Sequence, residues 1–329
     1  MTYTTPSSRR QLCALLGATL LLCLHPGAHA QTSWPAKPIR AVVGFAPGGG
    51  VDTMARTVSQ PLADLLGQAV VVDNKPGGSG NTSAADVMRA PADGYTILFA
   101  PLTQQTVNPY VMKGSPDMAK NMTPVAIVGR NKLHLVVKKD LPVRSVKELI
   151  ELARAQPGKL NYSSSGIATS PHLLGELFLK QTGVNMVHVP YKGSAPAMQS
   201  VLAGETDLVF DPGLAFQHVQ AGNMKLLAVA SDKRPSAFPN VPTMAEEGFP
   251  AITFDAWTGI WVPTGTPPEV IDKLSRSLQT VLSQPAVMQR FEGLNAEARY
   301  RNVAEFRAML DSETKTLSAI IKERNISLD

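Results

Sequence analysis

Short apolar runs alternate with segments of helical periodicity along most of the chain. In the first part, β-rich runs predict strands at residues 39–45, 69–73, 96–100, 125–128 and 133–138. Between the first two runs, apolar residues recur at helical spacing from Met54 to Leu66, and Gly67 follows where a helix is expected to end. Pro61 is expected to bend this helix without ending it. The alternation is typical of βαβ units and predicts a parallel sheet.

A second set of elements follows the first. Ser145 and Glu148 form a capping-box pattern, which predicts a helix start. Strands are predicted at 160–163, 186–189, 206–210, 225–230 and, after a Pro-rich stretch over 235–250, at 257–262, with helices around 269–282, 286–293 and 303–322. The last helices are expected to pack as a tail on another sheet. The pattern therefore predicts an α/β fold with two units.

The first 30 residues have the composition of an export signal. Arg9 and Arg10 precede an apolar run over 12–24, and Ala28-His29-Ala30 fits a small-x-small cleavage site. The apolar run is shorter than the roughly 20 residues that a membrane-spanning helix needs. We therefore expect a signal peptide that is cleaved near Ala30, and an exported mature protein. The paired arginines leave open whether export follows the twin-arginine or the general route.

Composition narrows the function classes. Both cysteines, Cys13 and Cys23, lie in the predicted signal, so the mature chain is expected to form neither a disulfide nor a thiolate site. Loss of Arg9 and Arg10 lowers the basic residues from 31 to 29 against 26 acidic residues, an excess too small to indicate nucleic-acid binding. The remaining histidines show no metal-binding spacing, so neither a metal nor another cofactor is expected. About 300 mature residues predict two domains.

The segment 45–53 (FAPGGGVDT) reads as a glycine loop between a strand and a helix start. Glycines allow close approach of backbone N–H groups, and the helix start adds unpaired N–H groups, which together form an anion site. Two alternatives stay open. The spacing approaches a dinucleotide fingerprint with Asp73 at the end of the next strand, although Thr53 replaces its third glycine. The loop is otherwise a plain connection in which Asp52 caps the helix.

Four more loops also follow predicted strands, and they cover residues 74–82, 161–172, 189–196 and 210–213. Ligands of open α/β sheets bind at the carboxyl ends of strands, so the loops are expected to line one site. Tyr191 is a candidate aromatic lid, and Lys192 either adds positive charge or is a solvated surface residue. Asp211 either fixes an ammonium group or caps the next helix.

Ser170 and His172 raise the alternative of a secreted hydrolase. Residues two apart on a helix do not face each other, and the chain has no Gly-x-Ser-x-Gly motif. We therefore expect His172 to brace its loop, and we expect no catalysis.

Taken together, these segments resemble the Bug family of TctC-like periplasmic solute receptors, the substrate-binding components of tripartite tricarboxylate transporters. The resemblance covers nearly the whole mature chain. It rests on Trp34-Pro35-x-Lys37-Pro38-Ile39-Arg40, Phe45-Ala46-Pro47-Gly48-Gly49-x-x-Asp52, Asn74-Lys75-Pro76-Gly77, Asp93-Gly94-Tyr95-Thr96, Asn108-Pro109, Ser170-Pro171-His172 and Val189-Pro190-Tyr191-Lys192-Gly193.

The resemblance implies two Rossmann-like α/β domains joined by two crossovers, which close on a ligand as in a type II periplasmic binding protein. Domain one would cover 33–131 plus 255–329, and domain two 132–254. The family holds a ligand carboxylate largely through backbone N–H groups and ordered water. By position, the ligand-binding residues would be Phe45, Ala46, Pro47, Gly48, Gly49, Asp52, Ser79, Gly80 and Thr103 on one side, and Ser165, Thr169, Tyr191, Lys192 and Asp211 on the other.

The chain departs from the family pattern at 164–169, where a glycine is lost and an apolar side chain is gained, and at 103–106. Both segments are expected near the distal end of the ligand, so they leave its identity open between a dicarboxylate, an aromatic acid and similar small acids. The resemblance implies a monomeric periplasmic receptor that passes its ligand to membrane permease subunits. A ligand sensor that signals to a membrane kinase is the alternative.

Overall fold

The computed structural model describes residue 1 and residues 34–324 of the chain. The predicted signal peptide therefore lies almost entirely outside the described residues. From Lys37 onward, the described residues form one compact unit. In the described part of the chain, no helix combines the length and the apolar character needed to cross a membrane.

The first sheet has six strands in the order β11-β4-β10-β3-β1-β2. They are β1 (Ile39–Val43), β2 (Val70–Asn74), β3 (Thr96–Pro101), β4 (Met122–Lys132), β10 (Asp255–Pro263) and β11 (Ala296–Arg301). Strand β1 pairs in parallel with β2 and β3, as predicted. Strand β10 is antiparallel to both β3 and β4, and β11 is antiparallel to β4. Strands β1 to β4 therefore run in one direction, as the parallel pattern predicts, and the sheet is mixed because β10 and β11 are antiparallel to their neighbours.

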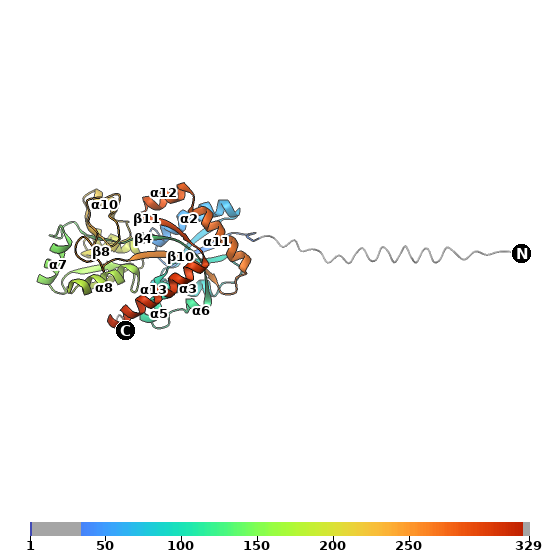
Figure 1. Cartoon of the computed structure of the whole chain (residues 1–329), viewed down its shortest axis with the longest axis horizontal. Coiled ribbons are helices and arrows are strands. Elements are labelled where there is room, and N and C mark those ends of the chain that lie inside the picture. Colours follow the sequence, from blue (N-terminus) through green and yellow to red (C-terminus); the bar gives the residue numbers. More distant parts are fainter. Residues whose placement is uncertain (2–33, 325–329) are drawn as a thin grey trace. The chain divides into compact units, whose positions relative to one another are not determined.

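The second sheet has five strands in the order β7-β6-β8-β5-β9. They are β5 (His134–Lys138), β6 (Asn161–Ser164), β7 (Val187–Pro190), β8 (Leu208–Asp211) and β9 (Met224–Val229). Strands β7 and β8 run parallel to β6, whereas β5 is antiparallel to β8 and β9. In Figure 1 this sheet carries green to yellow colours, while the first sheet combines blue with orange and red. The first sheet is thus built from both ends of the described chain.

Local signals set the ends of several helices. The long helices are α2 (Gly50–Leu66), α3 (Asn81–Met88), α7 (Val146–Ala155), α8 (Ser170–Thr182), α9 (Ser194–Leu202), α11 (Pro268–Leu282), α12 (Pro285–Gly293) and α13 (Val303–Arg324). Gly67 ends α2 in the left-handed conformation, and Pro61 lies inside that helix. The Ser145 hydroxyl accepts the Glu148 N–H at 3.2 Å, which confirms the predicted helix start, while the Glu148 carboxylate accepts the N–H of Arg144 at 2.6 Å in place of that of Ser145. The short helices η1 (Gly78–Gly80), α4 (Thr103–Thr106), α5 (Asn108–Val111) and α6 (Met118–Asn121) were not predicted, whereas α10 (Phe216–Gln220) is the helix expected after Asp211.

The chain passes between the sheets twice. Only Leu133 separates β4 from β5, and the return path runs from the end of β9 to the start of β10. The two connections lie side by side, because β4 and β10 pair as far as Lys132 and Asp255. Arg130 on β4 forms ion pairs with Asp255 on β10 and, at 2.8 Å, with Glu297 on β11. The structure confirms the α/β class with two sheets and two crossovers.

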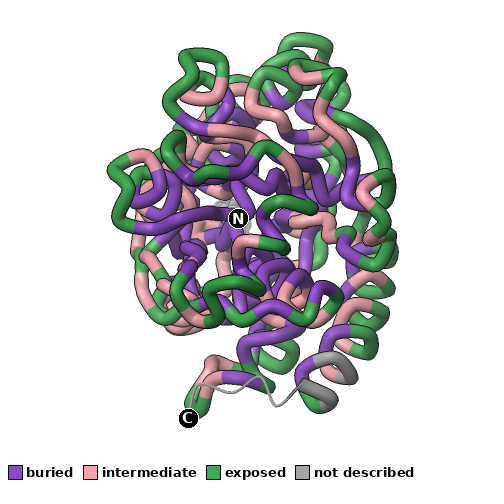
Figure 2. The backbone as a smooth tube through the Cα atoms, turned by 90° about the vertical axis from the view of Figure 1, so that its left-hand side faces the viewer, coloured by how far each residue is buried: buried purple, intermediate pink, exposed green. Residues whose placement is uncertain are grey.

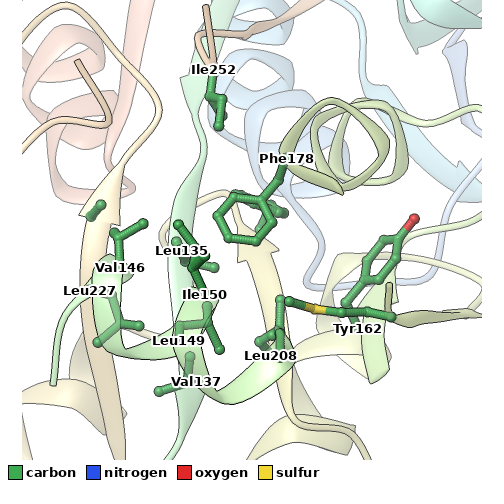
Figure 3. Packing of buried hydrophobic residues seen from close by; sticks show 14 of the residues in the cluster. Leu135, Val137, Val146, Leu149, Ile150, Tyr162, Phe178, Leu208, Leu227 and Ile252 are labelled. Carbon is green, nitrogen blue, oxygen red and sulfur yellow. The ribbon is translucent and has the colours of Figure 1, made fainter. Parts of the chain in front are cut away.

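Each sheet has its own apolar core. The core of the second sheet packs α7 and α8 against its strands, and Figure 3 shows Leu135, Val146, Phe178 and Leu208 in this cluster. The core of the first sheet includes Trp261, and the centroid of its ring lies 4.8 Å from that of Phe306 on α13. In Figure 2 most buried segments lie in the interior of the molecule, and most exposed segments are turns at its periphery. The two cores hold the loops at the strand ends in place.

Candidate functional site

Two adjoining cavities lie where loops from the two sheets meet. The inner cavity has a volume of about 50 Å³ and the outer cavity about 280 Å³. The inner cavity is lined by Phe45, Gly49, Gly50, Val51, Pro101, Asn131, Leu133, Ser165, Thr169, Ser170, Pro171, Ser194, Pro212, Ala256 and Thr258. The outer cavity is lined by Gly44, Phe45, Gly77, Gly78, Ser79, Met112, Ser165, Gly166, Ile167, Pro190, Tyr191 and Lys192. Phe45 and Ser165 contact both cavities, so the two form one cleft.

Three helices begin at the inner cavity. Gly49, Thr169 and Gly193 are the N-cap residues of α2, α8 and α9, and none of the three helices has a side-chain hydrogen bond at its cap. The first N–H groups of a helix have no partner within it, and they carry the positive end of its dipole. No residue lining the inner cavity has a charged side chain. The site therefore presents backbone N–H groups, and no cationic side chains, to an anion.

Asp52 holds the first loop in shape. Its buried carboxylate accepts the Gly48 N–H at 2.8 Å and the Asn74 side-chain N–H at 2.8 Å. Arg56 pairs with the same carboxylate at 3.0 Å and offsets its charge at the start of α2. Gly48 has a φ of +77°, a conformation that favours glycine. Asp52 thus acts on the loop backbone and lines neither cavity.

The first and fourth loops touch across the cleft. The Ala46 N–H donates to the Lys192 carbonyl at 3.0 Å. Gly193 has a φ of +147°, and a Cβ there would lie 3.1 Å from the Ala46 nitrogen. This close approach requires glycine, and it links the two sheets by a backbone hydrogen bond. The Lys192 side chain is exposed at the outer cavity.

The third loop forms its own hydrogen-bond network at the inner cavity. The Ser165 hydroxyl donates to the Thr169 hydroxyl at 3.0 Å, and the Thr169 hydroxyl donates to the Gly166 carbonyl at 2.6 Å. His172 Nδ1 accepts the Ala168 N–H at 3.1 Å, which agrees with the predicted bracing role of this histidine. Burial lowers the pKa of His172 to about 4, so the ring is neutral and can accept.

The same contacts count against a hydrolase. In the described residues, no hydrogen bond joins Ser170 to His172, and Nδ1 of the histidine is engaged by the loop backbone. Its Nε2 lies 3.8 Å from a carboxylate oxygen of Glu176, on the same helix. The ring is therefore oriented to support the loop, and it does not activate the serine.

A second histidine supports this loop from β7. The Nε2 atom of His188 lies 2.6 Å from the Ser164 hydroxyl, which in turn accepts the Gly166 N–H at 3.2 Å. The His188 ring stacks on that of His172 at a centroid distance of 4.0 Å. Burial, and to a smaller extent His172, lowers the pKa of His188 to about 3. Both rings are therefore neutral. The role of His188 was not predicted from the sequence.

The structure brings together half of the predicted site residues. Phe45, Gly49, Ser165 and Thr169 line the inner cavity, and Ser79, Tyr191 and Lys192 join the outer one. The Tyr191 hydroxyl lies 3.4 Å from Glu205, on an exposed side. The predicted residues that line neither cavity are Ala46, Pro47, Gly48, Asp52, Gly80, Thr103 and Asp211. Most of these shape the loops behind the cleft.

Three of the residues outside the cavities have distinct environments. The Gly80 carbonyl accepts the Gln104 side-chain N–H at 2.7 Å, and Thr103 is buried in α4. Asp211 is fully buried, and one carboxyl oxygen accepts the N–H groups of Gly213 and Ala215 at 2.7 and 2.9 Å. Burial raises the pKa of Asp211 to about 6. These bonds favour the capping alternative, because Asp211 caps the turn that leads into α10.

The residues that line the inner cavity beside the two connections were not predicted. Leu133 forms the first connection and follows Asn131 of β4, whereas Ala256 and Thr258 belong to β10, which follows the second connection. The Asn131 side-chain N–H donates to the Pro212 carbonyl at 3.4 Å. These positions carry no local motif, because only the pairing of β4 with β10 places them at the cavity. Among the described residues, no group of three or more histidine, cysteine or acidic side chains is arranged to hold a metal.

The family described as the tripartite tricarboxylate transporter family receptor matches residues 54–326. Protein BugT of Bordetella pertussis (strain Tohama I) is 33% identical over 325 residues, which cover 97% of this chain and 98% of BugT. The solved structure of the periplasmic binding protein BugD is 32% identical, with a TM-score of 0.85 over 89% of this chain and 99% of that one. The R. palustris protein Rpa4515, solved with adipate, is 33% identical, with a TM-score of 0.86 over 89% and 99% of the two chains.

Proposed function

Because the chain belongs to the receptor family of the tripartite tricarboxylate transporters, we propose that it is a periplasmic receptor that binds a small organic carboxylate in its cleft. The observation that carries this proposal is the convergence of three uncapped helix starts on an inner cavity without charged side chains. The adipate bound to the R. palustris relative supports the ligand class. The export signal predicted at the N-terminus and the periplasmic relative BugD support the location.

The hydrogen-bond donors of the inner cavity favour a carboxylate. The hydroxyl protons of Ser165 and Thr169 are already donated within the loop, so these groups have little left for a ligand. The remaining donors are the backbone N–H groups at the starts of α2, α8 and α9 and the hydroxyls of Ser170, Ser194 and Thr258. Neutral donors offset a single negative charge well.

Ligand binding is proposed to close the two domains of the receptor. The ligand carboxylate binds near Gly49, Ser165 and Thr169, with Phe45 between the two cavities and the rest of the ligand in the outer cavity. Domain one consists of 33–131 and 255–329 and domain two of 132–254, and the two close about the paired connections between the sheets. The closed monomer then presents its ligand to membrane permease subunits and catalyses no reaction.

Thermal unfolding with a panel of small molecules tests this function. A ligand present at 100 times its dissociation constant stabilises the folded state by roughly 2.7 kcal/mol, which raises the melting temperature by several degrees. We expect one or more organic acids to produce this shift and their amides to produce none. If sugars or metal ions raise the melting temperature and no carboxylate does, the proposed function is wrong.

A further inference from the structure

The outer cavity differs from the inner one in both size and chemistry. Its volume is about 280 Å³ against about 50 Å³, and the side chains of Phe45, Met112 and Ile167 line it from both sides of the cleft, beside Ser79 and Ser165. We propose that the body of the ligand beyond its carboxylate is apolar, as in an aliphatic or aromatic monocarboxylate, and that Ile167 and Met112 select it. This inference rests on the proposed function and names the ligand class within it.

The backbone on both sides of Ile167 is fixed. Gly166 has a φ of +133°, and a Cβ there would lie 2.8 Å from the Ser79 hydroxyl on the opposite loop. Ala168 has a φ of +64°, is fully buried and donates its N–H to His172. The loop therefore holds Ile167 at the outer cavity before a ligand arrives, which reduces the conformational entropy that is lost on binding.

Met112 reaches the same cavity from the other side of the cleft. It follows α5, and its sulfur accepts a side-chain N–H of Asn81 at 3.4 Å. Met112 also packs against an apolar cluster that joins both sides of the cleft, made of Val107, Val111, Ala168, Leu173, Leu317 and Ile321. The cluster contains the residue that follows Ile167. The apolar wall of the outer cavity is thus backed by buried core on both sides.

This wall suits an apolar group better than a second carboxylate. Apolar area that leaves water against Met112 and Ile167 contributes favourably, whereas a carboxylate placed there loses its hydration. Lys192 is the one charged residue that lines the outer cavity within the described chain, and its side chain is exposed. An exposed ammonium attracts a carboxylate weakly, so it does not compensate this loss.

Calorimetry with matched pairs of acids tests the inference. Each pair has one carbon skeleton and differs in the second carboxylate, as in hexanoate with adipate and 4-methylbenzoate with terephthalate. The monocarboxylate of a binding pair is expected to bind about tenfold more tightly, which corresponds to about 1.4 kcal/mol. A dicarboxylate that binds as tightly or more tightly overturns the inference, as does a Lys192→Gln variant that loses a bound diacid. If neither acid of any pair binds and no other organic acid raises the melting temperature, the proposed function itself fails.

Variants locate the selective wall. Ile167→Ser and Met112→Thr are each expected to weaken binding of the monocarboxylate about fivefold or more, because apolar contact is lost. Val187→Ser is the matched control, since Val187 is an exposed apolar residue of β7 that lines neither cavity. Circular dichroism and the melting temperature check that each variant folds. Wild-type affinity in both cavity variants would contradict the inference.

Discussion

At the scale of single residues, the histidines behind the third loop illustrate how buried groups set its shape. His172 and His188 stack at 4.0 Å, and Tyr162 stacks on His188 at 4.9 Å. His172 faces Glu176 at 3.8 Å, and Tyr162 donates to the same carboxylate at 2.6 Å. Neither imidazolium would be stabilised well here, because both rings are largely removed from water. The loop that lines both cavities therefore depends on neutral rings.

This arrangement predicts a pH dependence of stability. The pKa values of His172 and His188 are about 4 and about 3 in the folded protein, below the usual 6.5. As the pH falls, these histidines are therefore protonated at a higher pH in the unfolded chain than in the folded protein. Their contribution to stability is fully present above about pH 6.5 and is lost as the pH falls from there towards the folded pKa values. His188→Phe keeps a stacking ring and removes one titrating group. Between about pH 7.5 and about pH 5, this variant should lose roughly 2 kcal/mol less than wild type.

Urea denaturation at the two pH values measures this difference. The lost contact of His188 with Ser164 lowers the stability of the variant at both pH values, so the comparison uses the change with pH rather than the absolute value. Equal pH dependence in wild type and variant would show that His188 does not titrate differently on unfolding.

At the scale of elements, α13 meets α4 through a half-buried carboxyl group. The Thr106 hydroxyl donates to Glu313 at 2.7 Å, and burial raises the pKa of Glu313 to about 7. A carboxyl with a raised folded pKa favours the folded state below its unfolded pKa of 4.5, and this contribution is lost as the pH rises through about 7. Glu313→Gln keeps a hydrogen-bond acceptor and removes the ionisation. We expect it to stabilise the protein at about pH 8.5 by roughly 1 to 2 kcal/mol and to have little effect at about pH 5.

The control for this prediction lies on the same helix. Asp311 of α13 is exposed, so Asp311→Asn should change the pH dependence little. Chemical denaturation of both variants at the two pH values makes the comparison. A Glu313→Gln variant that is destabilised equally at both pH values would contradict the inferred cost of the buried charge.

The elements also show what the sequence could predict. Local signals such as the helix cap at Ser145 and the glycine stop at Gly67 are read within a few residues, and the structure has both. The direction of β5 and β10 depends on pairing with distant strands, so no local pattern contains it. Strand β11 has the charged residues Glu297, Arg299 and Arg301 at a sheet edge, which hides its strand character.

The candidate site also combines residues that the sequence could predict with residues that it could not. Gly49, Ser165 and Thr169 lie in loops whose composition marks helix starts, so their place at the inner cavity was predictable. Asn131 and Thr258 lie within strands and reach the cavity only because the two connections pair. Asp211 looked like a ligand contact by position, but its carboxylate is turned onto the following turn. Side-chain direction at a loop is decided by backbone donors that a sequence does not display.

At the scale of the whole molecule, the cleft is made by two sheets held at paired connections. Arg130 joins Asp255 and Glu297 across three strands of the first sheet, and its guanidinium lies 5.4 Å from the Trp257 ring. Across the cleft, the Ala46 N–H donates to the Lys192 carbonyl. Residues from both sheets line the inner cavity, so ligand binding and the approach of the two sheets are expected to be coupled.

Gly49 lies where the two sides of the cleft meet. A Cβ at this position would lie 3.4 Å from the Ala46 carbonyl oxygen and 3.7 Å from the Ser194 nitrogen at the start of α9. The branched side chain of valine would therefore crowd two of the three helix starts. If backbone N–H groups hold the carboxylate, Gly49→Val removes the main interaction, whereas Lys192→Ala removes only an exposed charge.

Titration calorimetry of these two variants with a carboxylate that binds wild type is the most direct test of the account. Gly49→Val should weaken binding by about a hundredfold or more and Lys192→Ala by about threefold or less, with both variants folded. Equal losses, or a larger loss in Lys192→Ala, would contradict recognition by the backbone of the three helix starts.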